Sequence, residues 1–223
     1  MQTKEALKIM KVKESCHPTG WPAGRTMKVK DAKEITGSLP RTSKMPGLSY
    51  SLPASECKTG SKLRKIKGSV CASCYALKGN YTRYKAIKAA QYVRLKAIED
   101  ARWVEAMTAQ VKRSTYFRWH DAGDVQDLDH LKKIYAVCEA TPGTSHWLPT
   151  REAWIKDHLA SKPDNLVIRF SPPMIGQRND TWPNSSMVVE KDATCPAPSQ
   201  GGKCGDCRQC WDPAVKVVSY GKH

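Results

Sequence analysis

The order of apolar and polar positions predicts strands that alternate with helices from about residue 47 onward. Residues 48–53 alternate apolar and polar side chains, as a half-buried strand does. Later apolar runs are short and rich in β-branched or aromatic residues, which favours further strands. These lie at 114–119, 143–148, 165–170, 187–189 and, more weakly, 215–220.

Helical periodicity fills several of the intervals. Over about 81–112, apolar residues recur at spacings of three and four, which predicts one helix with a packing face. This face comprises Ala86, Ala90, Val93, Ala97, Ala101, Val104 and Val111. Shorter helices are expected at 128–140 and 152–161. Because alternating strands and helices imply a parallel sheet, and the units are too few for a full barrel, we predict an α/β fold with a partial parallel (βα) barrel.

Composition divides the chain into three parts. Residues 1–46 are basic and repeatedly interrupted by Pro and Gly, which predicts an irregular arm. Residues 47–190 hold the βα partial-barrel core. Residues 191–223 are expected to form a cysteine-rich C-terminal extension, because cysteines and glycines leave little room for regular elements between 194 and 211.

The formal net charge of +16 indicates which class of partner to expect. Residues 1–67 hold fifteen Lys and Arg against five Asp and Glu. Such a surplus attracts polyanions, so nucleic acid or an acidic host protein is the predicted partner of this basic N-terminal region; the alternative is a solvated basic face. No run of eighteen apolar residues occurs, so a membrane partner is not expected. The charged N-terminus does not resemble a secretory signal, which favours the cytoplasm.

Nine cysteines point to a chemical role for the chain. Their number is odd and several lie close together, and in a reducing compartment such a set favours metal binding over disulfide bonds. Two of the nine stand apart from the rest. Cys138 lies among apolar residues of a predicted helix, where a buried thiol is expected, and Cys16 lies in the arm.

The later cysteine group has the more specific spacing. It consists of Cys195, Cys204, Cys207 and Cys210, the last three at intervals of three residues. A chain that curls around an iron–sulfur cluster presents thiolates at such intervals, and the neighbouring glycines let the backbone approach the cluster. The alternative is a structural zinc site made of the same four thiolates.

The earlier cysteine group consists of Cys57, Cys71 and Cys74. Three cysteines that follow the first strand of a βα fold suit a [4Fe–4S] cluster whose fourth iron stays open to a substrate or cofactor. Cys16 and Asp121 are alternative fourth ligands, and zinc bound by the three thiols and a histidine such as His120 is the competing interpretation. Seven thiolates would also suffice for one larger cluster shared by both groups.

Several predicted strands end in polar residues, and the carboxyl ends of parallel strands form the working face of βα folds. The residues expected at this rim are His120, Asp121, Asp124, Thr150, Arg151, Arg169 and Ser171. We assign catalytic roles, in acid–base chemistry or anion binding, to His120, Asp121, Asp124 and Arg151. The alternative is structural: the two aspartates cap the next helix or pair with the arginines, and the histidine bonds locally.

The chain resembles the phage gene-product-88 domain family over about residues 47–211. The resemblance rests on the strand before Cys57, on Cys71-x-x-Cys74-Tyr75-Ala76, on Arg118-Trp119-His120-Asp121-Ala122-Gly123-Asp124, on Pro149-Thr150-Arg151 and on the late cysteines. It implies a phage-encoded, cluster-binding protein that acts in the cytoplasm of the infected bacterial host.

A more distant similarity is to radical-SAM enzymes, which place three cysteines after the first strand of a partial βα barrel. Two features depart from that pattern. Thirteen residues separate Cys57 from Cys71, and the aromatic residue follows the last cysteine. No glycine-rich SAM-binding stretch follows the second strand, so SAM cleavage is not assigned.

Together these features predict an iron–sulfur protein with redox or radical chemistry at the strand-end rim. Its predicted cluster or metal ligands are Cys57, Cys71, Cys74, Cys195, Cys204, Cys207 and Cys210. The alternative prediction is a nucleic-acid or host-protein binding protein whose iron–sulfur or zinc sites are structural.

Overall fold

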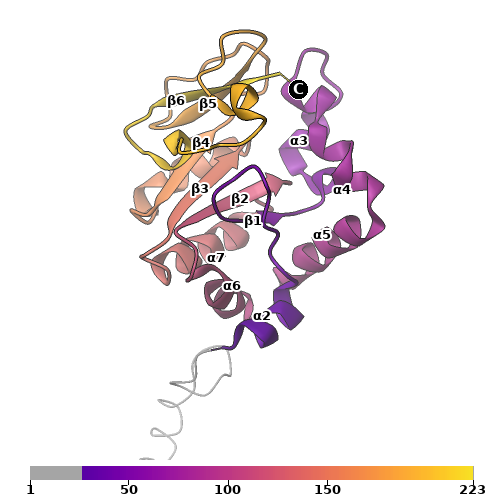
Figure 1. The fold of residues 1–223 in the computed structure, drawn as a ribbon, viewed down its shortest axis with the longest axis vertical. Coiled ribbons are helices and arrows are strands. Elements are labelled where there is room, and N and C mark those ends of the chain that lie inside the picture. The colour runs from indigo at the N-terminus through magenta and orange to yellow at the C-terminus, as the bar shows by residue number, and fades with distance from the viewer. Residues whose placement is uncertain (1–26, 223) are drawn as a thin grey trace, which may run out of the picture.

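The chain folds around a six-stranded sheet in which all neighbouring strands are parallel (Figure 1). The computed structural model describes residues 27–222. Its strands are β1 (Leu48–Ser51), β2 (Tyr116–Ala122), β3 (Ser145–Thr150), β4 (Leu166–Phe170), β5 (Ser185–Val189) and β6 (Val217–Gly221). Their spatial order equals their order along the chain. The predicted parallel α/β fold is thereby confirmed.

The sheet is open. Across the described residues, β1 and β6 form its two edges and do not pair with each other. A closed or partial barrel is therefore not confirmed. The last strand, β6, pairs with β5 along five residues, from Ser185–Val217 to Val189–Gly221. The C-terminal segment thus adds the last strand to the same sheet, and the predicted cysteine-rich C-terminal extension is not confirmed.

Helices connect the first strands. The α-helices are α2 (Val29–Thr36), α3 (Lys58–Leu63), α4 (Asn80–Arg83), α5 (Lys85–Ala97), α6 (Trp103–Val111) and α7 (Leu128–Glu139). The short 3₁₀ helices are η1 (Ala54–Glu56), η2 (Val70–Ser73), η3 (Tyr75–Leu77), η4 (Ala153–Ser161), η5 (Ala197–Gln200) and η6 (Gln209–Trp211). Of these, η4 replaces the α-helix predicted at 152–161. None of the helices in the described part of the chain is long and apolar enough to cross a membrane.

One face of the sheet packs against α6 and α7. Trp103 of α6 stacks on Trp119 of β2, with ring centroids 6.1 Å apart, and Phe117 meets the same Trp119 edge-on at 4.8 Å. All three rings are fully buried. Burial of each such side chain stabilises the fold by about 2–3 kcal/mol. This aromatic layer, together with aliphatic residues of α7 and β4, forms the main core.

The single helix predicted over 81–112 is wrong, because three helices occupy this segment. α5 ends at Ala97, and the carboxylate of Asp100 then accepts a hydrogen bond from the Arg102 backbone N at 2.8 Å. Because of this local bond, the Arg102 backbone N needs no partner from a continuous helix, and the chain can turn into α6. Val93, on the predicted packing face, is 49% exposed. The apolar repeat therefore does not mark one buried stripe.

The predicted irregular arm contains a helix in its described part. α2 packs against α6, and the buried Met27 and Ala32 contact Ala106 and Ala109 of that helix. Gln110 of α6 donates hydrogen bonds to Thr36 Oγ1 at 2.7 Å and to the Gly37 carbonyl at 3.1 Å. Residues 29–36 are therefore part of the folded body, and residues 1–26 lie outside the described residues.

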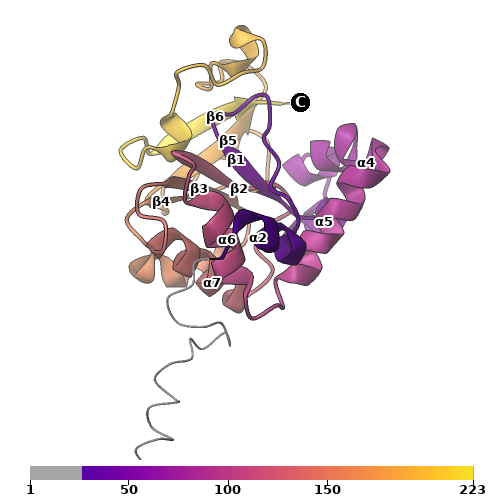
Figure 2. The same cartoon turned by 60° about the horizontal axis from the view of Figure 1, so that its bottom comes forward.

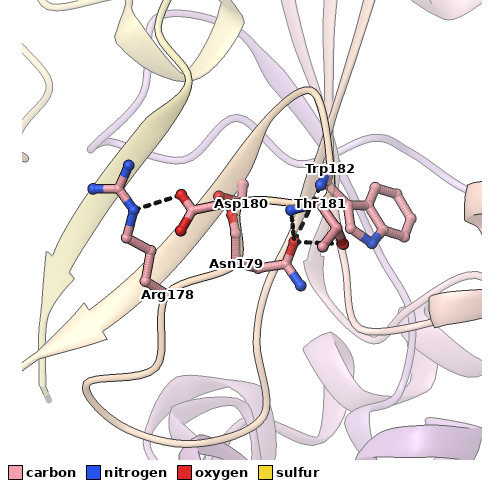
Figure 3. Close-up of polar contacts among 6 residues, drawn as sticks. Arg178, Asn179, Asp180, Thr181 and Trp182 are labelled. Carbon is pink, nitrogen blue, oxygen red and sulfur yellow. Dashed lines mark hydrogen bonds and ion pairs between the residues drawn. The ribbon is translucent and has the colours of Figure 1, made fainter.

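A structured loop joins β4 to β5. The side-chain oxygen of Asn179 accepts hydrogen bonds from the backbone N of Thr181 and Trp182, at 3.0 and 3.1 Å (Figure 3). This turn directs Trp182 onto Phe170 at the end of β4, where the rings stack at 4.7 Å. The loop is thus fixed to the end of the sheet at which β4 terminates.

Candidate functional site

The first cysteine group lies beyond the end of β1. Cys57 follows η1, Cys71 lies in η2, and Cys74 ends η2. A methyl group added to Gly60 would lie 3.7 Å from Sγ of both Cys57 and Cys71, and 2.9 Å from Cβ of Cys57. The two sulfurs therefore flank the same glycine, which leaves room beside them that a side chain would fill.

Hydrogen bonds tie this cysteine segment to the ends of three other strands. Glu152, just after β3, accepts from the backbone N and Oγ1 of Thr59 at 3.0 and 2.8 Å. The backbone N of Val70 donates to the Pro173 carbonyl beyond β4 at 2.9 Å. The hydroxyl of Tyr75 donates to the Asp121 carbonyl of β2. The segment that carries the three thiols thus lies across the carboxyl ends of the strands.

The thiols of this group share one electrostatic environment. Burial raises the pKa of Cys57, and the nearby carboxylate of Asp124 and the thiols of Cys74 and Cys71 raise it further. Burial also raises the pKa of Cys71, while the guanidinium of Arg151 opposes that shift. Grouped thiols of this kind ionise when a cation neutralises them, as a bound metal does.

Asp124 joins two strand ends at this rim. Its carboxylate accepts from Thr150 Oγ1 at 2.7 Å and from the Arg151 backbone N at 2.8 Å. Burial raises the pKa of Asp124 to about 6, although these hydrogen bonds oppose the shift. The guanidinium of Arg151 donates to the carbonyls of Ser171 and Pro172 at 2.9 and 2.6 Å. The predicted gathering of Asp124, Thr150, Arg151 and Ser171 at one rim is therefore present.

The helix-capping alternative for the two aspartates is wrong. The cap of α7 is Asp127, whose carboxylate accepts from the His130 backbone N at 2.8 Å. Asp121 instead accepts from Ser49 Oγ of β1 at 2.7 Å, so it links two strands. Burial raises the pKa of Asp121.

His120 lies in a different environment from the other predicted rim residues. Its ring is 3% exposed and packs edge-on against Tyr50 at 5.7 Å and His130 at 5.5 Å. Within the described residues neither ring nitrogen has a hydrogen-bond partner, and burial lowers the pKa of His120 well below its usual value. Its backbone φ of 52° is in the left-handed region, a strained conformation for a non-glycine residue. The ring thus belongs to the aromatic core.

The second cysteine group lies on the connection from β5 to β6, above the face of the sheet opposite α6 and α7. The backbone N of Cys195 donates to the Ser219 carbonyl of β6 at 3.0 Å, and that of Cys204 donates to the Lys44 carbonyl at 2.9 Å. Sγ of Cys210 lies 3.1 Å from the hydroxyl of Tyr220. The first and last cysteines of the group are thereby fixed to β6, and Cys204 is fixed to the segment before β1.

Arg169 anchors the end of this cysteine connection. Its fully buried guanidinium, which projects from β4, donates hydrogen bonds of 2.7 to 3.4 Å to the carbonyls of Ser185, Gln209, Cys210, Asp212 and Val215. Arg169 was expected at the rim, where it could pair with the aspartates, but its donors are directed at these carbonyls instead. Trp211 adds a second anchor, with its indole N donating to the Phe117 carbonyl at 3.0 Å.

Arg118 is a charged residue near the second cysteine group to which sequence reasoning assigned no role. Its guanidinium lies 4.5 Å above the Trp147 ring and counteracts the burial that raises the pKa of Cys204 and, to about 11, of Cys210. Burial also raises the pKa of Tyr75, the residue after Cys74, and the same guanidinium opposes that rise. Arg118 therefore carries a positive charge within reach of Cys204, Cys210 and Tyr75. The sequence did offer one signal for this position. Arg118 alternates with Phe117 and Trp119 along the predicted second strand, so its side chain was expected on the opposite face of the sheet.

No three side chains of Cys, His, Asp or Glu converge on one point within the described residues, as the ligands of a single ion do. Each thiolate of a cluster binds a different iron, so cluster ligands are spaced more widely than those of one ion. Of the two remaining cysteines, Cys138 is fully buried in α7, as predicted. Cys16, an alternative ligand, lies outside the described residues.

These features define a parallel α/β protein with two groups of thiols, one at the strand ends and one across a face of the sheet. The chain belongs to the phage family of gene product 88, whose family model matches residues 23–213. No curated protein and no solved structure matches the chain.

Proposed function

We propose that the protein binds iron–sulfur clusters through its two thiol groups and uses them for redox or radical chemistry at the strand-end rim. The observation that carries the proposal is the convergence of the first group on the rim. Sγ of Cys57 and Cys71 flank Gly60, and Cys74 adds a third thiol within electrostatic reach. A bound cluster would supply the positive iron charge that buried thiolates need and a centre for electron transfer.

The rim offers groups that can act on a molecule beside the first cluster. Asp124, with a pKa raised to about 6, can exchange a proton near neutral pH. The guanidinium of Arg151 influences the thiol of Cys71 and lies in the same neighbourhood. In this proposal Asp124 and Arg151 serve the reacting molecule. Asp121 links β1 to β2, and His120 shapes the core beneath the rim.

The experiment that tests the proposal measures iron, sulfide and zinc in anaerobically purified protein. Cysteine ligands hold iron together with acid-labile sulfide in a cluster, and the visible absorbance should bleach on reduction. Zinc in place of iron, with no visible absorbance, would contradict the redox function and support structural zinc sites.

Single cysteine variants then separate two sites from one shared cluster. If each group holds its own cluster, Cys71→Ser and Cys207→Ser should each remove part of the iron, and the double variant all of it. If one cluster is shared, either substitution alone should remove all iron. Cys138→Ala is the matched control, since this buried thiol lies in α7 outside both groups. If the two single variants, the double variant and the Cys138→Ala control all held the same amount of iron, the ligand assignment would be refuted.

A further inference from the structure

Residues 57–98 carry charge of one sign. This segment contains eleven Lys and Arg and no Asp or Glu. Arg94 is buried, whereas the other ten side chains are exposed: Lys58, Lys62, Arg64, Lys65, Lys67, Lys78, Arg83, Lys85, Lys88 and Lys96. The surplus of the described chain is therefore concentrated here, and only residues 57–67 of this segment overlap the N-terminal region to which the sequence assigned the polyanion.

These charges lie on one lobe of the molecule. α3, α4 and α5 lie together beside the sheet in both views (Figures 1 and 2). We call residues 57–98 the basic lobe. The ion pairs of the described residues are Arg102–Asp100, Arg178–Asp180 and Lys222–Glu190, all outside this lobe. Its positive charge is thus not neutralised by ion pairs within the described chain, and it attracts a polyanion.

Exposed aromatic rings alternate with these charges along α5. Tyr84 is the N-cap residue just before α5, and Lys88, Tyr92 and Lys96 follow it at intervals of four residues. Residues at this spacing lie on the same side of a helix, with a rise of about 6 Å from each to the next. Tyr84 is 51% and Tyr92 41% exposed. The hydroxyl of Tyr92 donates to Glu56 at 3.2 Å, which holds the ring at the surface.

We propose that the basic lobe binds single-stranded nucleic acid along α5. The lysines contact the phosphates, and Tyr84 and Tyr92 stack on unpaired bases, the combination by which single strands are bound without sequence preference. A duplex offers the same phosphates, but its base faces are stacked on one another, so the exposed tyrosine rings could not stack on them. An acidic protein would complement the positive charge, but this would not explain why exposed tyrosine rings alternate with the lysines. The proposal is independent of cluster chemistry.

Binding of the full chain to a fluorescently labelled oligopyrimidine, measured by anisotropy at several salt concentrations, tests the proposal. The variant Lys85→Gln, Lys88→Gln and Lys96→Gln should lower the slope of log Kobs against log salt by about 2, since each phosphate contact on a single strand contributes about 0.7. Tyr84→Ala with Tyr92→Ala should weaken binding about tenfold for each ring, because stacking contributes at this level. Tyr84→Phe with Tyr92→Phe should bind as the natural protein does.

The matched control removes the same charge elsewhere. Lys132, Lys156 and Lys191 are exposed and lie outside the basic lobe, so their replacement by Gln should leave the salt slope unchanged. An equal loss in this control would overturn the proposal, as would equal binding of a duplex or full competition by polyglutamate. Circular dichroism and iron content, measured on every variant, separate lost binding from lost folding or a lost cluster.

Discussion

A single buried arginine holds the end of the connection that carries the second cysteine group. Arg169 is surrounded by carbonyl groups of the cysteine connection and of β5, and burial lowers its pKa. The five hydrogen bonds compensate for the loss of hydration of the cation, because a buried charge needs such partners. The strand position of Arg169 was predictable from sequence. Its partners were not, because they come from residues up to 46 positions away.

Replacement of Arg169 by Met should destabilise the protein by about 3–5 kcal/mol, because several buried carbonyls would lose their donor. The measurement is urea unfolding followed by circular dichroism. Arg178→Met is the control, since the ion pair of Arg178 with Asp180 is solvent-exposed and such pairs contribute less than about 1 kcal/mol. If both variants unfolded at the same urea concentration, Arg169 would not be an anchor.

At the scale of elements, strands were easier to predict than helices. The strand predicted at 165–170 corresponds to β4 (Leu166–Phe170), and even the weak tail strand is present as β6. Apolar runs determine strands because the sheet buries them directly. The prediction of one long helix was wrong because apolar periodicity does not reveal where a helix ends. Here the end is marked by Asp100, whose carboxylate accepts a hydrogen bond from the Arg102 backbone N. The 3₁₀ character of η4 also has no signature in an apolar repeat.

The start of α7 provides a test at this scale. Asp127→Ala should cost about 1 kcal/mol of stability, because the cap bond to the His130 backbone N is lost. Asp129→Ala is the control: Asp129 lies in the first turn of the same helix and does not cap it, so a smaller loss is expected. Thermal unfolding of both variants measures the difference, and equal losses would rule out a specific cap.

At the scale of the whole molecule, the sequence predicted that the strand ends would form a rim but not how the two cysteine groups relate to each other. Cys57 follows the first strand, so its place at the carboxyl edge followed from topology. The proximity of Cys204 and Cys210 to Arg118 of β2 depends on how the β5–β6 connection folds back over the sheet, and spacing alone does not specify that path. Tyr75 of η3 and Tyr220 of β6 also lie near Arg118, although they are far from it in sequence.

Buried histidines should make the stability of the whole fold depend on pH. Burial lowers the pKa of His130 to about 3 and of His146 to about 4, below the value of about 6.5 in an unfolded chain. Between these values the unfolded chain binds protons that the folded chain excludes, so these histidines reduce folding stability as pH falls from 7 to 5.

For His146 this loss amounts to about 2 kcal/mol between pH 7 and 5. Gln can replace the contact of His146 with Thr141 Oγ1, which spans 2.9 Å, and it does not titrate. The variant His146→Gln should therefore lose about 2 kcal/mol less than the natural protein over this pH range. Urea unfolding at both pH values measures the change, and parallel losses in the two proteins would contradict the assignment.

The agreement between strand order and chain order has a consequence for biosynthesis. As the polypeptide leaves the ribosome, β1 to β4 emerge first and can pair without waiting for later residues. The strand ends around Cys57, Cys71 and Cys74 can therefore be assembled while the rest is still being translated. The neighbourhood of Cys210 depends on Tyr220 of β6 and must wait for it. Any loading of the two thiol groups would then follow the order of translation, the strand-end group first.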